Sequence, residues 1–310
     1  MLSEDIVIDW ITSTFKIARN DAVVLENTEG RKVVINVDAF DSTLHWPPFL
    51  DSYSAGLRAY RGSTSDVIVR GARPIAVVIA LRIPVNMDFS ILQGFIKGLS
   101  NAAEELKAVY IGGDTDIVED ENFRAEVVSI GVSISKVLGR GNARPGDIVA
   151  VTGDFGVSSL IYEIIKGKTL PLPMEETLKA WLTPKWPSLE KWFENTDLIN
   201  ASIDNSDGLA LSLHYLAESS QVGLELDNIP IYKPLVEQYG EREALERALY
   251  QSGEEYNFIF TIPPDYEWLV EQLNAHIIGR VVQGEGVQLA GYGPIERRGW
   301  IGGRGYSKRV

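Results

Sequence analysis

Residues 201–213 read ASIDNSDGLALSL, and the fold prediction depends on the pattern in this stretch. A short apolar run ends at Asp204, a turn of Asn, Ser, Asp and Gly follows, and residues 209–219 have helical spacing. An aspartate directly after a strand is held on a rigid element while its side chain points into a crevice. Carboxylates in such places bind hard cations such as Mg²⁺. The stretch therefore predicts an α/β protein with a metal site at the end of a strand.

Aspartates also mark the ends of other apolar runs along the chain. They are Asp21 in RNDAVVL, Asp38 in VVINVDAFD, Asp66 in GSTSDVIVRGARP and Asp114 in YIGGDTD, besides Asp204 and Asp207. Aspartate is a common helix cap and turn former, so each of them alone could be structural. Together, beside small and polar residues, they predict a site that holds several metal ions and a polyphosphate.

Composition narrows the class of protein. The chain has 310 residues, 45% of them hydrophobic, which is enough for two domains. A net charge of -14 argues against nucleic acid as a partner. There is no cysteine, which excludes disulfides, Cys-zinc sites and thiol nucleophiles. The first residues resemble no signal peptide, and no apolar run has membrane-spanning length, so we expect a cytoplasmic protein.

Strand and helix patterns alternate along the chain. The expected strands are 32–37, 75–83, 125–135, 148–152, 222–226, 256–262 and 277–282, and the expected helices are 54–70, 89–106, 209–219, 241–250 and 266–274. Residues 174–194 suggest a pair of helices. Gly, Pro and charge cluster in GRGNARPGD at 139–147, which is the best internal boundary. We therefore predict an α/β (α+β) fold with domains 1–139 and 140–310.

Familiar phosphate and hydrolase motifs are missing from the sequence. Gly167-Lys168-Thr169 would need a glycine at position 162 to form a P-loop, and Tyr162 stands there. There is no GxGxxG between a strand and a helix, and neither GxSxG nor HExxH occurs. Nucleotide binding, if present, must therefore use a different arrangement.

The order of the acidic motifs resembles one family. NDAVVL, NVDAFDSTLHW, STSDVIVRGARP, GGDTD, DNSDGL and SGEEYNFIFT occur in the order found in the thiamine-monophosphate kinase family, from about residue 20 to about 300. That family belongs to the aminoimidazole ribonucleotide synthetase-like superfamily, which binds ATP without a P-loop. The resemblance implies mixed sheets covered by helices, and a homodimer formed through N-terminal strands. It also implies an N-terminal domain that binds ATP and Mg²⁺ and a C-terminal domain that completes the site.

The resemblance also implies residue roles. The implied Mg²⁺ ligands are Asp21, Asp38, Asp66, Asp114, Asp204 and Asp207, and the implied ATP contacts are Gly113, Asp114, Arg140 and Ser206. His45, Glu254 and Trp300 correspond to substrate-binding residues, and Asp207, Asp66 and Asp114 to the catalytic set. His45 and Arg140 could equally be packed or surface residues, and a tryptophan such as Trp300 is more often a buried anchor.

The implied reaction is ATP-dependent phosphorylation of thiamine monophosphate to thiamine diphosphate. Joining two anionic phosphates requires in-line positioning and charge neutralisation rather than a covalent nucleophile, and several Mg²⁺ ions on fixed carboxylates supply both. The chain departs from the family pattern at Asn20, Asn36, Val37, Ser252 and Glu255. These departures leave two alternatives: another ATP-dependent enzyme of the superfamily, such as an aminoimidazole ribonucleotide synthetase-like one, or a non-catalytic nucleotide-binding relative.

Overall fold

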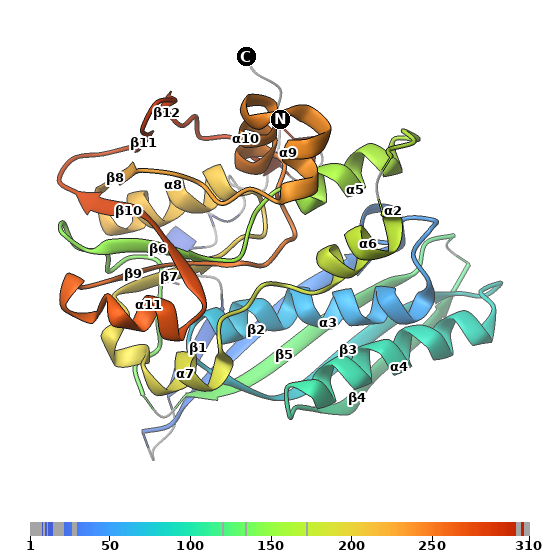
Figure 1. The fold of residues 1–310 in the computed structure, drawn as a ribbon. Coiled ribbons are helices and arrows are strands. Elements are labelled where there is room, and N and C mark those ends of the chain that lie inside the picture. Colours follow the sequence, from blue (N-terminus) through green and yellow to red (C-terminus); the bar gives the residue numbers. More distant parts are fainter. Residues whose placement is uncertain are drawn as a thin grey trace.

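The computed structural model describes residues 8, 10, 12–14, 22–26, 30–119, 121–133, 135–171, 173–301 and 305–306. Within these residues the chain forms two mixed or antiparallel β-sheets with helices between and around them (Figure 1). The predicted metal ligand Asp21 and the departure at Asn20 lie outside the described residues.

The N-terminal sheet has five strands in the order β1-β2-β5-β3-β4. Its strands are β1 (Val23–Glu26), β2 (Lys32–Asp41), β3 (Arg73–Pro84), β4 (Val109–Val118) and β5 (Arg124–Ser133). Among the strand pairs of this sheet within the described residues, β3 and β4 alone are parallel, because the long helix between them carries the chain back across the sheet. Strands 32–37 and 75–83 were predicted and are longer in the structure.

Two helices cover one face of this sheet, α3 (Ser52–Val69) and α4 (Phe89–Glu105), and the short α2 (Ser42–His45) follows β2. Glycines let α3 and α4 approach closely: a Cβ at Gly56 would lie 1.9 Å from the carbonyl oxygen of Phe95, and one at Gly98 would lie 1.9 Å from that of Tyr53. As the sequence predicts, Asp88 caps α4, accepting from the backbone N–H of Ser90.

The C-terminal sheet has seven strands in the order β12-β11-β8-β10-β6-β9-β7. Its strands are β6 (Ile148–Thr152), β7 (Ala201–Asp204), β8 (Gly223–Leu226), β9 (Phe258–Ile262), β10 (Ala275–Val282), β11 (Val287–Leu289) and β12 (Gly293–Pro294). The helices of this half are α5 (Val157–Ile165), α6 (Met174–Leu182), α7 (Leu189–Glu194), α8 (Leu209–Ser220), α9 (Lys233–Tyr239), α10 (Glu241–Tyr250) and α11 (Trp268–Gln272). A small hairpin of β13 (Trp300–Ile301) and β14 (Gly305–Tyr306) follows. The helix expected at 266–274 is shorter, because a 3-10 turn at Pro264–Tyr266 precedes α11.

Helix α3 lies between the two sheets (Figure 1). Its C-terminal residues Ile68 and Val69 are fully buried against Phe258 and Phe260 of β9. The indole N–H of Trp192 on α7 donates to the carbonyl oxygen of Ile68 at 2.8 Å. One helix therefore belongs to both cores and fixes how the halves sit. The first sheet ends at Ser133 and the second begins at Ile148; the exact division at 139/140 stays a prediction.

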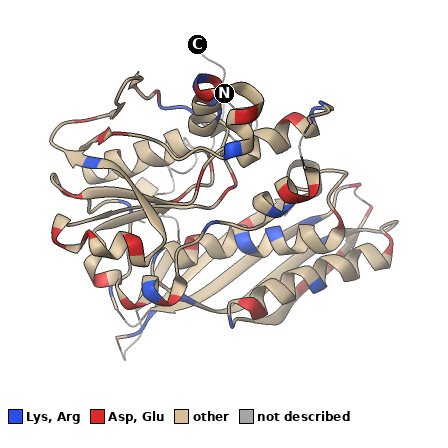
Figure 2. Cartoon of the chain, viewed as in Figure 1, with Lys and Arg blue, Asp and Glu red and all other residues tan. Residues whose placement is uncertain are grey.

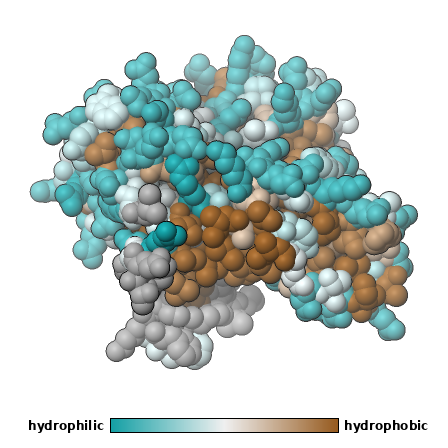
Figure 3. All heavy atoms as spheres, turned by 90° about the horizontal axis from the view of Figure 1, so that it is seen from below, coloured by the Kyte–Doolittle hydropathy of each residue, from teal (hydrophilic) through white to brown (hydrophobic). Residues whose placement is uncertain are grey.

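The other face of the N-terminal sheet, which we call the open face, has no covering helix in the part of the chain that the structure describes (Figure 1). Register places on it Val23 and Leu25 of β1, Val33, Ile35 and Val37 of β2, Val128 and Ile130 of β5, and Val78 of β3. Charged residues are sparse along these strands (Figure 2), and an apolar patch covers the corresponding surface (Figure 3). Val37 is 61% exposed and Leu25 56% exposed. A patch of this kind on an isolated chain indicates an interaction surface.

Candidate active site

A cavity of about 570 Å³ lies where β2 and α3 face the C-terminal half. Seven residues singled out from the sequence line it: Asp38, His45, Asp66, Ser206, Asp207, Glu254 and Trp300. They come from β2, α2, α3, the β7–α8 turn, the loop after α10 and the C-terminal hairpin. The fold thus gathers residues that lie up to 262 positions apart, from 38 to 300.

Three aspartates line one side of the cavity, which we call its acidic floor: Asp38 on β2, Asp66 on α3 and Asp207 in the β7–α8 turn. Asp38 lies on the face of β2 that packs toward α3, and burial raises the pKa of its carboxyl, with the charge of Glu254 adding to the effect and His45 opposing it. Asn36 donates from Nδ2 to Oδ2 of Asp66 at 2.7 Å and to the carbonyl oxygen of Ser63 at 3.1 Å. Asn36, a position at which the chain departs from the family pattern, therefore holds the carboxylate of Asp66 in place through its side-chain amide.

The β7–α8 turn adds the second acidic pair. Asp204 ends β7 and is 2% exposed, and the hydroxyl of Ser65 on α3 donates to its Oδ2 at 2.5 Å. Asp207 lines the cavity, and its carbonyl oxygen accepts from the backbone N–H of Trp300 at 2.8 Å. Gly208 has φ 113, a conformation that favours glycine, and it starts α8 directly behind Asp207. The turn therefore fixes both carboxylates and the C-terminal hairpin at once.

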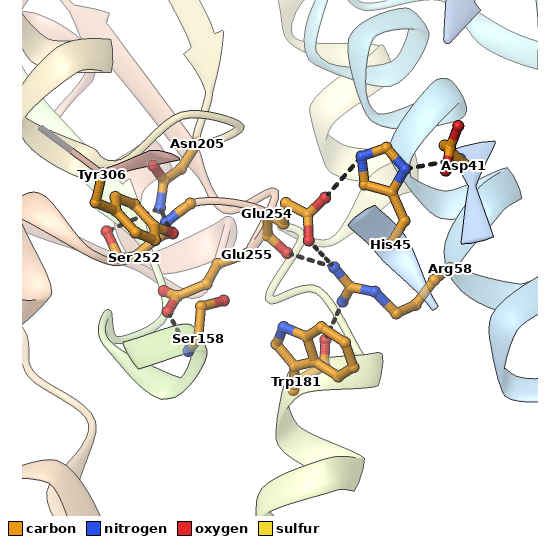
Figure 4. Close-up of polar contacts among 11 residues, drawn as sticks. Asp41, His45, Arg58, Ser158, Trp181, Asn205, Ser252, Glu254, Glu255 and Tyr306 are labelled. Atoms are coloured by element: carbon orange, nitrogen blue, oxygen red, sulfur yellow. Dashed lines mark hydrogen bonds and ion pairs between the residues drawn. The ribbon is translucent and has the colours of Figure 1, made fainter. Parts of the chain in front are cut away.

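Residues 252–256, the acidic loop, contact residues from both halves of the chain (Figure 4). The Ser252 hydroxyl accepts from the N–H of Leu209 at 3.1 Å, so it caps α8. Gly253 N–H donates to the Tyr306 hydroxyl at 3.2 Å, and Glu254 N–H donates to the carbonyl oxygen of Ser206 at 2.7 Å. Both Glu254 (φ 59) and Tyr256 (φ 57) adopt the left-handed region, which side chains other than glycine rarely occupy. Strain of this kind persists where the surroundings fix the backbone.

Glu255 is a structural member of this loop. Its buried carboxylate accepts from the backbone N–H groups of Gly156 and Ser158 at 2.9 Å each, at the N-terminus of α5 (Figure 4). Burial raises the pKa of Glu255 well above its ordinary value, and the two N–H groups oppose that rise. Ser252 and Glu255, two positions at which the chain departs from the family pattern, therefore cap helices. Glu254 is the carboxylate of this loop that lines the cavity.

Glu254 is held by two side chains of the N-terminal half. Its Oε2 accepts from Nη2 of Arg58 at 2.9 Å, and its Oε1 lies 3.7 Å from Nε2 of His45 (Figure 4). His45 Nδ1 accepts from the backbone N–H of Asp41 at 2.9 Å, so the neutral ring carries its hydrogen on Nε2. The cavity therefore presents an N–H donor beside a carboxylate acceptor.

Aromatic rings form another wall. Trp300 and Tyr162 each meet the ring of Tyr306 edge to face, with centroids 5.3 Å apart in both pairs. Burial raises the pKa of the Tyr306 hydroxyl above its ordinary range, so it stays protonated. Arg58, Tyr162, Trp181, Tyr256 and Tyr306 line the cavity and were missed from the sequence. Only the SGEEY motif signalled one of them, Tyr256, since aromatic and arginine side chains at helical spacing are usually structural.

Three of the predicted site residues, Asp114, Gly113 and Arg140, lie away from the cavity. Asp114 pairs in register with Ala80 on the open face, whereas Asp38 faces the opposite side of the same sheet. A Cβ at Gly113 would lie 1.7 Å from the carbonyl oxygen of Ile79, so this glycine permits the pairing of β4 with β3. Arg140 packs over the ring of Tyr215 at 5.4 Å and does not line the cavity. One chain therefore does not bring these residues together with the acidic floor.

The donor set of the cavity consists of oxygens, which Mg²⁺ prefers. No three carboxylate or histidine side chains among the described residues lie close enough together to hold an ion by themselves. This fits Mg²⁺, which proteins commonly hold through one or two carboxylates together with substrate phosphates. Among the described helices, none has the length and apolar character needed to cross a membrane.

Comparison with known proteins defines the class first. Residues 19–133 match the family described as AIR synthase related protein, N-terminal domain, and residues 144–291 match the corresponding C-terminal domain. The fold also resembles the hydrogenase maturation protein HypE, at 19% identity with a TM-score of 0.69 over 84% of this chain and 88% of that chain. The molecule is therefore a two-domain protein of the AIR synthase related class.

Nearer relatives specify the family. A thiamine-monophosphate kinase of Pyrococcus horikoshii is 34% identical over 81% of this chain and 79% of its own length. One from Aquifex aeolicus is 31% identical over 96% and 97% respectively. The solved structure of AaThiL complexed with AMPPCP and TMP superposes with a TM-score of 0.84 at 29% identity, covering 97% of both chains. The chain belongs to the thiamine-monophosphate kinase family, a family of phosphotransferases.

Proposed function

We propose that this protein transfers the γ-phosphoryl group of ATP to the phosphate of thiamine monophosphate and forms thiamine diphosphate. The observation that carries the proposal is the single cavity in which Asp38, Asp66 and Asp207 meet Glu254 and Trp300. Further support comes from the AaThiL structure with AMPPCP and TMP, which this chain matches over nearly its whole length. The use of ATP in turn favours a cytoplasmic location.

The acidic end of the cavity suits phosphates that bring their own cations. Asp38, Asp66, Asp204 and Asp207 would hold Mg²⁺, with Asp21 and Asp114 as further ligands. Such ions, when bound, neutralise the charge that develops on the phosphoryl oxygens. Asn36 supplies an amide donor to Asp66, and Ser65 a hydroxyl donor to Asp204, so that both carboxylates keep one orientation. Ser206, in the turn before α8, lines the cavity and would contact the nucleotide.

The reaction needs no covalent intermediate on the protein. An oxygen of the acceptor phosphate attacks the γ-phosphorus, and the bond from that phosphorus to the bridging oxygen of ADP breaks in line. Asp207, Asp66 and, from a second copy, Asp114 would contribute by fixing the cations that orient the two substrates, since positioning and charge neutralisation account for most of the catalysis of phosphoryl transfer.

The other end of the cavity suits the acceptor's organic part. A thiazolium ring is cationic, and Trp300 offers an aromatic face while Glu254 offers a negative charge. The Nε2–H of His45 can donate to an aminopyrimidine, and Oε1 of Glu254 can accept from it. This end therefore discriminates the acceptor, while the acidic end carries the chemistry.

We also propose that two copies pair through their open faces. The apolar patch gives the driving force (Figure 3), and Asp114 lies on the same face of the sheet. A second copy packed there would bring its Asp114 toward a site that a single chain leaves without it. Gly113 and Arg140 do not line the cavity of one chain. We propose that they contact ATP because the family resemblance implies this role.

The first test is an activity assay on the wild-type protein. We expect thiamine diphosphate, detected as fluorescent thiochrome diphosphate, only when ATP, Mg²⁺ and thiamine monophosphate are all present, and no product once EDTA removes the metal. Asp207→Asn should lower kcat by roughly 10²-fold or more, since it removes a fixed charge from the reacting phosphates.

Asp265→Asn, at an exposed position of the C-terminal half, is the matched control and should keep wild-type activity. If the wild-type protein makes no thiamine diphosphate although it binds ATP with Mg²⁺, the acceptor assignment is wrong.

A further inference from the structure

Arg58 is the most enclosed charged side chain of the cavity. It lies in the middle of α3 and is 5% exposed. Its Nη1 donates to the carbonyl oxygen of Trp181 at 3.1 Å, and its Nη2 donates to Oε2 of Glu254 at 2.9 Å (Figure 4). The guanidinium carbon stacks 3.5 Å above the Trp181 ring. A planar guanidinium can make these contacts at once, which a lysine cannot.

The guanidinium is therefore committed to the protein rather than presented to a ligand. Both of its terminal nitrogens have protein partners, and Trp181, itself 5% exposed, covers one face of the group. Glu254, in contrast, is 37% exposed at its side chain and lines the cavity. The ion pair joins a buried cation to an accessible anion, so the cation restrains the group that a substrate can reach.

Glu254 needs such a restraint because a glutamate has several rotatable bonds. Its backbone is already fixed in the left-handed region and by the bond from its N–H to Ser206. Arg58 fixes the remaining end by binding Oε2, which leaves Oε1 on the side of His45 Nε2 at 3.7 Å. A group held in its binding geometry loses less entropy when the ligand arrives.

We propose that Arg58 is a positioning residue that sets acceptor specificity by locking Oε1 of Glu254 beside His45. The inference rests on the proposed function, because it concerns recognition of the thiamine moiety at that end of the cavity. Arg58 itself does not touch the acceptor. Its loss therefore weakens recognition of the organic part and leaves the acidic end intact.

Arg61 provides a matched control on the same helix. It lies one turn further along α3, also binds the end of α6 through the carbonyl oxygen of Leu182, and also pairs with a glutamate, Glu105. Glu105 lies on α4 and does not line the cavity. Arg58 and Arg61 thus share the task of joining α3 to α6, and only Arg58 contacts a cavity residue.

The experiment compares Arg58→Met, Arg58→Lys and Arg61→Met with the wild type in steady-state kinetics. For Arg58→Met we expect the KM for thiamine monophosphate to rise by about 10- to 100-fold, the range expected for a charge-assisted hydrogen bond, while kcat and the KM for ATP change by less than about threefold. Arg58→Lys should recover part of the effect, because it keeps the charge without the planar contacts. Arg61→Met should leave both KM values unchanged. Melting temperatures of the three variants report whether each one folds.

A double-mutant cycle tests whether Arg58 acts through Glu254. If it does, Arg58→Met combined with Glu254→Gln should raise the KM for thiamine monophosphate no further than Glu254→Gln alone. Additive effects, or equal effects of Arg58→Met and Arg61→Met on KM, would overturn the inference while the proposed function stands. A wild-type protein that does not phosphorylate thiamine monophosphate would overturn both. If Arg58→Met does not fold, Arg58→Lys is compared with Arg61→Met instead. A KM for thiamine monophosphate that stays at the wild-type value in Arg58→Lys would then contradict a role for the planar contacts.

Discussion

At the scale of single residues, the departures from the family pattern have structural reasons. Ser252 stands where the family has a glycine, and its buried hydroxyl accepts from the N–H of Leu209 at 3.1 Å and from Nδ2 of Asn205 at 3.3 Å. Ser252→Ala leaves the N-terminus of α8 without this cap. We expect the free energy of unfolding to fall by about 1–2 kcal/mol, measured by denaturant titration.

Ser219→Ala, at an exposed position near the end of the same helix, is the control and should change stability by less than about 0.5 kcal/mol. Equal stability of the Ser252 and Ser219 variants would show that Ser252 is not a cap. Ser252 also lies two residues before Glu254, so a loosened loop should raise the KM for the acceptor slightly.

The sequence predicted the acidic residues of the cavity better than it predicted the arginine and the aromatic residues. Asp38, Asp66, Ser206 and Asp207 stand in motifs whose spacing is visible in the sequence, and they line one cavity. Arg58 and Trp181 stand at ordinary helical positions 123 residues apart. Their contact depends on how α6 packs against α3, which no local pattern encodes. The same holds for Asp114, whose motif is clear but whose face of the sheet only strand register reveals.

At the scale of elements, α3 connects the two halves and carries site residues from one end to the other. Asp51 caps it, accepting from the backbone N–H of Ser54 at 2.9 Å and from its hydroxyl at 2.7 Å. Partial burial opposes ionisation of Asp51, but these hydrogen bonds prevail and lower its pKa below the ordinary value of 3.8. A lowered pKa in the folded state means that the carboxylate stabilises the protein above pH 3.8 and that this contribution is lost as the pH falls through the folded-state pKa.

Asp51→Ala should therefore lower the free energy of unfolding by about 0.5–2 kcal/mol at pH 7, with a smaller difference from wild type below pH 3.8. Asp51→Asn is the control, because an amide still caps the helix but does not titrate; its stability should stay near wild type at pH 7. Thermal unfolding followed by circular dichroism across this pH range measures both. A loss in Asp51→Ala that is as large in acid as at pH 7 would contradict a role for the charge.

Element boundaries followed local chemistry where that chemistry is strong. The helix at 89–105 begins at its predicted cap, Asp88, and the strand at 124–133 begins within one residue of the prediction. The strand at 109–118 was not among the predicted strands, because Gly112 and Gly113 are typical of turns. They sit in the strand here since the backbone of β3 approaches too closely for a side chain at Gly113. Tertiary packing overrode the local preference.

At the scale of the whole molecule, the apolar open face suggests that a second copy of the chain covers it and helps to form the site. Ile130 lies on β5 in the middle of the N-terminal sheet, paired with Ile35 of β2. Apolar side chains continue on both sides of it, from Leu25 of β1 to Val78 of β3. A surface of this character is stable in water when another apolar surface covers it. The same face carries Asp114, and Val37 and Ala39, which alternate with Asp38 along β2 and so lie on this face, also line the cavity.

Ile130→Lys places a charge at the centre of this face and should convert a dimer into a monomer, as measured by sedimentation or by light scattering after size exclusion. Burying an unpaired lysine in an interface is unfavourable enough to lower the dimer affinity by several orders of magnitude. Because Asp114 of a second copy would complete the site, specific activity should fall with the dimer and recover in part at high protein concentration. Trp268→Lys, at a position 48% exposed on α11, is the matched control and should leave both mass and activity unchanged. A monomeric Ile130→Lys protein with full activity would show that one chain suffices and that Asp114 has no part in catalysis.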